Sequence, residues 1–160
     1  MILKLIYTLF LALLVALFVG LGIDAFYPGP KIPDYPVELE ISKPGEEDTE
    51  AQKTARGNFE KSQREFQEKS KTYNRNVSIA AISAAIIILV LSLTLLSKIK
   101  MIADGILLGG VFTVAYSIIR GLMSEDSRFR FLIVTAGLII ALILGYIKFI
   151  REKEKTIKDL

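Results

Sequence analysis

Neither cysteine nor histidine occurs in this sequence of 160 residues. Without cysteine there is no disulfide, no thiolate metal site and no cysteine nucleophile. Without histidine the commonest general base and metal ligand are missing, which excludes a Ser-His-Asp triad, the helical zinc motif and haem held through histidine. Carboxylates, lysine, tyrosine and hydroxyls remain, but no pair of carboxylates has a spacing that indicates catalysis. We therefore predict a non-enzymatic protein without a cofactor or metal.

A strongly basic face is also lacking. The 20 Lys and Arg residues are interleaved with 17 Asp and Glu residues, and the net charge is only +3. Binding of nucleic acid needs a basic patch, so we expect no nucleic-acid partner. The Lys-rich tail at 151–160 suits the anionic headgroups of a lipid surface instead, at about 1 kcal/mol per basic residue.

Apolar residues are abundant, at 52% of the chain with a mean hydropathy of +0.46. They form four long blocks, and about 20 helical residues cross a hydrocarbon layer of ~30 Å. We predict an all-α integral membrane protein with four transmembrane helices, a Pro-rich linker and a protruding polar helix that continues into the second transmembrane helix. The expected segments are transmembrane helix 1 at 1–27, linker 28–48, polar helix 49–76, transmembrane helix 2 at 77–97, transmembrane helix 3 at 101–119, polar loop 120–130, transmembrane helix 4 at 131–150 and charged tail 151–160.

The first apolar block has two interpretations. Lys4 before it and Gly20 and Gly22 near its end also fit a signal peptide. Its apolar part is long for such a peptide and no A-x-A pattern ends it, so we expect an uncleaved anchor.

The next segment predicts an extended linker followed by a long helix. Residues 28–36 contain four prolines, which prevent helix formation. Thr49 and Gln52 fit a capping box that starts a new helix. No proline or glycine separates the polar helix from the second apolar block, which predicts one helix over about 49–97, roughly 70 Å long, with Asn74 and Asn76 as the expected place for a kink.

Phe59, Phe66 and Tyr73 lie seven residues apart on the polar helix and form a narrow heptad seam. We expect this seam to dock a protein helix, in this chain or in another. An amphipathic helix lying on lipid is the alternative, which the mixed charge of the segment disfavours.

Small residues recur at four-residue steps in every apolar block, so each helix offers a smooth face for close packing. We expect these faces to build a compact bundle within the chain, with packing between subunits as the alternative. The predicted packing residues are Ala12, Ala16, Gly20, Ala80, Ala84, Gly105, Gly109, Thr113, Gly137, Ala141 and Gly145.

Two carboxylates, Asp24 and Asp104, approach the membrane interior, where a charge usually marks an ion path. Both stand near helix ends, so exposure to water and headgroups is the simpler interpretation. Lys100 is the nearest basic residue to Asp104 by sequence. The hydroxyls Ser78, Ser83, Ser92, Thr113 and Ser117 fit either a pore lining or ordinary bonds to backbone carbonyls, and helical hydroxyls usually do the latter.

The distribution of basic residues predicts the orientation. Lys4, Lys98, Lys100 and the tail lie on one side of the membrane, which the positive-inside rule places in the cytoplasm together with both termini. The segment 28–76 then lies outside, although its nine Lys and Arg residues argue for the reverse.

The segment FVGLGIDAFYPGP at 18–30, with an acidic loop behind it and three further apolar helices, resembles uncharacterised small four-helix membrane proteins of candidate-phylum bacteria. The likeness covers mainly residues 1–40. It implies a bacterial inner membrane and nothing about mechanism.

Two functions compete on this sequence. The first is a membrane scaffold or accessory subunit that docks a partner protein or another copy through its extramembrane helix and its small-residue faces. The alternative is an oligomeric small transporter or channel that uses Asp104 and the glycine-rich third helix.

Overall fold

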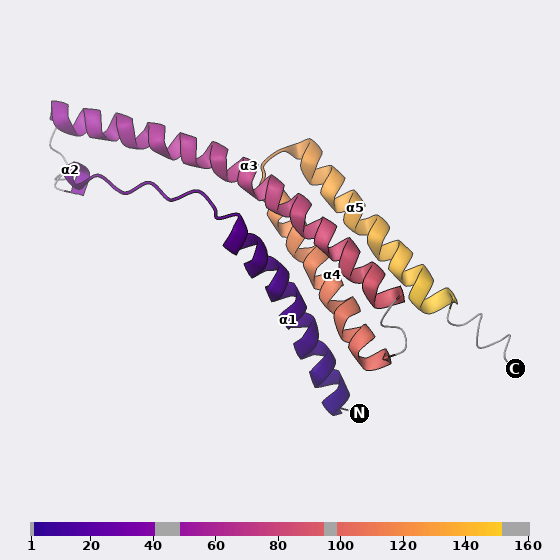
Figure 1. The fold of residues 1–160 in the computed structure, drawn as a ribbon. Helices are drawn as coiled ribbons and strands as arrows, with labels where there is room; N and C mark the ends of the chain where they lie inside the picture. Colours follow the sequence, from indigo (N-terminus) through magenta and orange to yellow (C-terminus); the bar gives the residue numbers. More distant parts are fainter. Residues whose placement is uncertain (1, 41–48, 95–98, 152–160) are drawn as a thin grey trace, which may run out of the picture.

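The computed structural model describes residues 2–40, 49–94 and 99–151. Its helices are α1 (Ile2–Phe26), α2 (Val37–Glu40), α3 (Glu50–Thr94), α4 (Lys100–Leu122), α5 (Ser127–Gly145) and the π-helical segment η1 (Tyr146–Arg151) (Figure 1). Part of the predicted linker (41–48), Lys98 and the lipid-binding tail beyond Arg151 lie outside the described residues, so those predictions stay untested.

The prediction of four apolar helices is confirmed. Helices α1, α3, α4 and α5 are each long and apolar enough to cross a membrane. Their outer faces carry large hydrophobic side chains: Phe18 on α1 is 80% exposed and Leu142 on α5 is 65% exposed. Water is a poor solvent for such faces and acyl chains are a good one.

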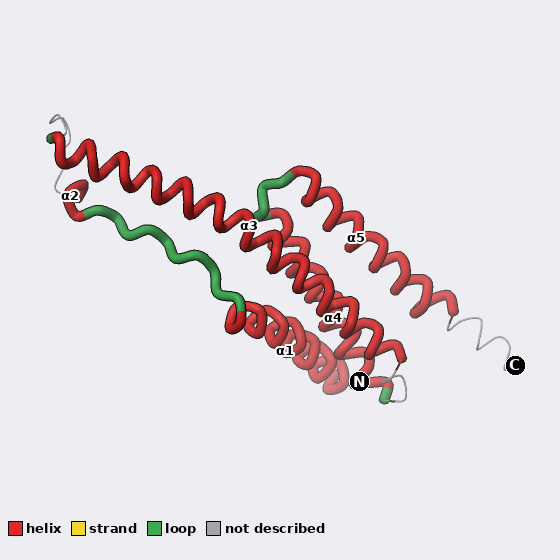
Figure 2. The backbone as a smooth tube through the Cα atoms, turned by 45° about the horizontal axis from the view of Figure 1, so that its top comes forward, coloured by secondary structure: helices red, strands yellow, loops and turns green. Residues whose placement is uncertain are grey.

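Helix α4 is the centre of the bundle, with contacts to α1, α3 and α5 (Figures 1 and 2). Helices α3 and α4 run antiparallel and share the most extensive contact, whereas α1 lies mainly against α4 and touches α3 little. The buried apolar centre consists of Ala85, Leu89 and Val114, with α5 side chains packed against it.

The connection between α4 and α5 is shorter than the predicted polar loop at 120–130. Helix α4 continues to Leu122 and α5 begins at Ser127, so only 123–126 lie outside helices. The Asp126 side chain caps α5 by accepting the backbone N–H groups of Arg128 and Phe129. The arginines of this segment are good helix formers, which explains why polarity alone was misleading.

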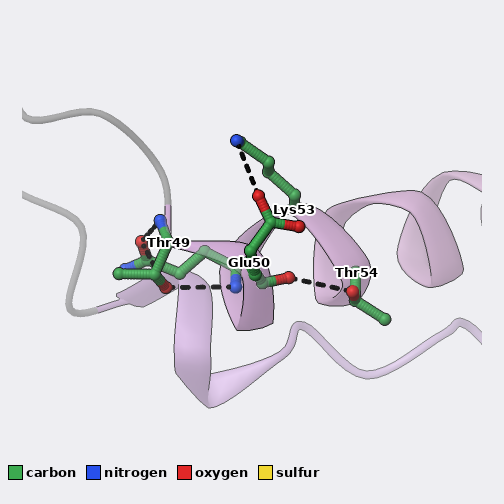
Figure 3. A network of polar contacts seen from close by, with 5 residues as sticks. Thr49, Glu50, Lys53 and Thr54 are labelled. Atoms are coloured by element: carbon green, nitrogen blue, oxygen red, sulfur yellow. Dashed lines mark hydrogen bonds and ion pairs between the residues drawn. The ribbon is translucent and has the colours of Figure 1, made fainter.

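Helix α3 is continuous through 45 residues, from the polar segment into the apolar one. The predicted capping box is present at its start: the Thr49 N–H donates to Gln52 Oε1 at 2.8 Å and the Gln52 N–H donates to Thr49 Oγ1 at 3.4 Å. A second local bond runs from Thr54 Oγ1 to the Glu50 carbonyl (Figure 3).

We call residues 50–76 of α3 the arm and residues 27–36 the strap. The arm projects beyond the bundle, and the strap runs outward from the end of α1, alongside the arm, to α2 (Figures 1 and 2). Near the outer end of the arm, Gln52 Nε2 donates to the Glu38 carbonyl at 3.4 Å. The strap and α2 therefore lie alongside the arm.

Candidate functional site

The small residues of α1 and α4 meet inside the chain. A Cβ added at Gly105 would lie 2.8 Å from Leu11 Cδ2, and one at Gly109 would lie 2.6 Å from Val15 Cβ. Ala12 is fully buried, and Gly20 faces the Tyr116 ring. Backbones can approach this closely only where side chains are missing.

On α3 the packing face is shifted by one residue from the predicted one. Ala80 is exposed and Ala84 is half-buried beside an apolar groove between α1, α3 and α4. The fully buried alanines of α3 are instead Ala81 and Ala85. Both pairs have four-residue spacing, so spacing alone could not distinguish them; one residue is about 100° of rotation on a helix.

Reciprocal hydrogen bonds fix the α3–α4 register. Ser78 Oγ donates to the Ser117 carbonyl and Ser117 Oγ donates to the Ser78 carbonyl, both at 2.7 Å. Further along, Ser92 Oγ donates to the Ala103 carbonyl at 2.6 Å. Thr113 and Ser83 bond carbonyls of their own helices. These five hydroxyls therefore bond backbone carbonyls, as the simpler interpretation predicted.

The small-residue face of α5 is only partly used. A Cβ at Gly137 would lie 2.7 Å from Ile118 Cδ1, but Ala141 is exposed and Gly145 has no atom within 4 Å of its Cβ position. Helices α4 and α5 therefore leave a groove of about 270 Å³ between them. Its lining includes Leu107, Val111, Ile140, Leu144, Gly145 and Lys148.

An ion pair stands at one end of this groove. Lys148 Nζ lies 2.8 Å from Asp104 Oδ1, and the two side chains are 32% and 37% exposed. Lys148 belongs to the π-helical segment η1, whose wider turn changes the direction of its side chains relative to α5. The predicted neighbour Lys100 is thus not the partner seen here, because the packing of α5 on α4 brings Lys148 across.

The aromatic seam of the arm lies against the strap of its own chain. Tyr73 stacks on Tyr27 with ring centroids 5.3 Å apart, and Phe59 meets Tyr35 edge to face at 5.2 Å. Phe66 is half-buried and lines a groove between the arm and the strap. The seam does find a partner, but an extended proline-rich segment takes the place of the expected helix.

A cluster of polar and aromatic side chains joins the inner end of the arm, its root, to the bundle. Arg120 Nη1 donates to Asn74 Oδ1 at 3.0 Å, and its Nε donates to the Tyr116 hydroxyl at 3.1 Å. The guanidinium carbon lies 5.8 Å from the Tyr73 ring centroid and 5.4 Å from that of Tyr116, within cation–π range.

Asp24 belongs to the edge of this cluster. The Tyr73 hydroxyl donates to Asp24 Oδ1 at 3.5 Å, and Asn76 Nδ2 donates to the Tyr27 hydroxyl at 3.0 Å. Partial burial raises the pKa of Tyr73, the Arg120 charge opposes this, and the Asp24 charge adds to it. Tyr73 therefore stays neutral at physiological pH and acts as a donor to the carboxylate.

Sequence reasoning missed Arg120 and Lys148 as organising residues. Arg120 was assigned to a loop, and Lys148 was counted within an apolar helix. A signal was available for Lys148, because a lysine inside a membrane segment usually faces a partner or a polar surface. Arg120 offered no comparable signal, since its partners Asn74 and Tyr116 come from distant parts of the chain.

Comparisons with known protein families, curated protein sequences and solved structures find no match to this chain.

Proposed function

We propose that this chain is a non-catalytic scaffold or accessory subunit of a cell membrane, crossing the bilayer four times and holding its arm outside for another protein to dock. One observation carries the proposal: α3 runs without a break from a polar arm into the apolar bundle. The arm and the apolar segment are therefore parts of one helix, with no loop between them.

The contacts around the arm favour an arm that is held rigidly on the bundle rather than one that moves freely. The strap touches it through the Tyr27–Tyr73 and Tyr35–Phe59 ring contacts. Arg120 holds its root, and Lys71 Nζ lies 2.7 Å from Glu125 Oε2 in the α4–α5 connection. The arm extends about 40 Å at 1.5 Å per residue, so a docked protein would sit well clear of the lipid surface.

The docking surface in this proposal is the face of the arm opposite the strap. The seam is occupied by the chain itself, which leaves exposed charges of both signs, among them Glu60, Lys61 and Arg64. Pairs such as Arg64–Glu60 at 3.7 Å are solvent-exposed and contribute little to folding. They are available to set the specificity of a protein partner by charge complementarity.

The proposed setting is a bacterial inner membrane with both termini in the cytoplasm and the arm on the outer side. The positive charge of the short segments supports this orientation. A second copy of the chain is included among the possible docking proteins.

Site-specific photocrosslinking in native membranes tests the proposal. A photoreactive residue at Lys61 or Arg64 should give an adduct of one discrete mass. The matched control is Leu142, an exposed residue of α5 that we assign to lipid. If the arm positions give no adduct and the gently extracted particle contains a single chain, the scaffold proposal is wrong.

The competing proposal is an oligomeric transporter or channel. The Asp104–Lys148 pair beside the α4–α5 groove favours it, since paired charges within membrane segments often mark ion paths. In that case flux into liposomes would depend on Asp104, and Asp104→Asn would abolish it. Purified protein that leaves liposomes impermeable would remove this alternative.

A further inference from the structure

The groove between α4 and α5 differs from the apolar groove between α1, α3 and α4 in having charge at one end. The groove between α1, α3 and α4 is lined by apolar side chains, including Phe18, Ile87 and Ile106. The α4–α5 groove is lined by Leu107, Val111, Ile140 and Leu144 along its length and by Lys148 at one end. It therefore has apolar walls along its length and a charged end at Lys148, which we call its mouth.

The position of this mouth along α5 matches the depth of lipid headgroups. Lys148 follows Ser127, the first residue of α5, by 21 residues. That separation is roughly 31 Å along a helix, about the thickness of the hydrocarbon layer. With Ser127 at one surface, the ion pair lies at the opposite one, and the groove extends from there into the hydrocarbon.

The size of the groove selects its occupant. A volume of 270 Å³ holds about nine groups the size of a water molecule or a methylene, at ~30 Å³ each. Water has no polar partners along the apolar walls. An acyl chain is apolar like the walls and is the surrounding solvent in a membrane.

The ion pair selects the headgroup. Lys148 offers N–H donors to a phosphate, and Asp104 offers acceptor oxygens to an ammonium. An anionic headgroup would meet the carboxylate 2.8 Å from the lysine and be repelled by it. A zwitterionic headgroup with a primary ammonium matches both charges, and a quaternary ammonium cannot donate a hydrogen bond to Asp104.

From this geometry we infer that the α4–α5 groove binds one phospholipid with a primary ammonium headgroup, of the phosphatidylethanolamine type. One acyl chain fills the groove beside Gly145. The phosphate accepts hydrogen bonds from Lys148, and the ammonium donates hydrogen bonds to Asp104. The site is independent of the arm and of whatever docks there.

The experiment reconstitutes the full chain in vesicles of equal parts phosphatidylethanolamine, phosphatidylcholine and phosphatidylglycerol. After gentle extraction, native mass spectrometry counts the lipids retained per chain. We expect one retained phospholipid, with phosphatidylethanolamine enriched about fivefold, the scale of one charged contact at a membrane surface. Equal retention of the three lipids would overturn the inference.

Two substitutions separate the groove from the headgroup contact. Gly145→Leu fills open space, since no atom lies within 4 Å of its Cβ position, and should abolish lipid retention. Gly22→Leu, at an equally open position on α1, is the matched control and should retain the lipid. Asp104→Asn should keep the lipid but shift the preference towards phosphatidylglycerol, because the Asp104 carboxylate that repels an anionic headgroup is then absent.

Other outcomes contradict the site. Undiminished retention in Gly145→Leu would show that the lipid binds elsewhere. A dimer in the wild type that Gly145→Leu converts to a monomer would show that the face binds a second copy. A preference for phosphatidylethanolamine that survives Asp104→Asn unchanged would remove the assigned role of the carboxylate.

Discussion

The two halves of α3 are parts of one helix, yet different interactions hold them. The inner half lies on α4 through fully buried small residues, Ala81 and Ala85, and through the Ser78–Ser117 hydrogen bonds. The outer half, the arm, touches its strap through one stacked and one edge-to-face pair of aromatic rings. Arg120 and Glu125 contact its inner end, and most of its other side chains are exposed.

The difference follows from the solvent proposed for each half. In lipid, burying another apolar group gains little, so helices associate by close fit and by hydrogen bonds. In water, burial of an aromatic ring is itself favourable, so a few large rings can hold an extended segment on a helix.

The largest effect should come from Ala81→Leu in the inner half. Ala81 is fully buried, and forcing a larger side chain into a packed interface costs about 1–3 kcal/mol. Reversible unfolding in mixed micelles measures the loss. Ala80→Leu is the matched control. Ala80 is the neighbouring residue and is exposed, so the free energy of unfolding of this variant should equal that of the wild type. Equal losses in the two variants would contradict the observed α3 face.

Removing the reciprocal serine bonds should have a smaller effect. Ser78→Ala or Ser117→Ala should cost about 0.6–1.7 kcal/mol, the measured scale for hydrogen bonds between membrane helices. The double variant should cost less than the sum, since the two hydroxyls share a site. The same unfolding assay measures this double-mutant cycle. Ser83→Ala is the control, because the Ser83 hydroxyl bonds a carbonyl of its own helix.

Disturbing the outer half should affect the strap and leave the bundle intact. Tyr73→Ala removes the ring that stacks on Tyr27 and faces Arg120. We expect faster hydrogen exchange in α2 and at the outer end of the arm, with unfolding of the bundle unchanged. Tyr73→Phe keeps the ring and should behave like the wild type. Unchanged exchange would contradict the role assigned to the Tyr73 ring, and a destabilised bundle would show that the two halves are not separate.

The smallest effect concerns the contact between the arm and the α4–α5 connection. The hydrogen bond from Lys71, and then its charge, lower the pKa of Glu125. A carboxyl with a lowered pKa stabilises the folded state above its ordinary pKa of 4.5, and this contribution disappears as pH falls through the lower folded value. Carbon NMR of labelled Glu125 in micelles should show the lowered pKa, and Lys71→Gln should restore it.

Much of the fold was predictable because it depends on local patterns. Block length predicted four apolar helices, and Thr49 with Gln52 predicted the start of α3. The face of α3 was not predictable, because Ala80/Ala84 and Ala81/Ala85 have the same spacing and only the opposing α4 surface selects between them. The partners of Asp104 and of the aromatic seam were missed for the same reason: Lys148 and the strap are distant in sequence.

The central claim is that the arm and the α4–α5 connection lie on one side of a membrane, and the start of α4 on the other. Accessibility labelling of single cysteines, introduced at Lys61, Glu125 and Lys100 in this cysteine-free chain, tests it directly. We predict that an impermeant reagent outside intact cells labels positions 61 and 125 alike and leaves position 100 unlabelled until the membrane is opened. Labelling of positions 61 and 125 from opposite sides would contradict the account.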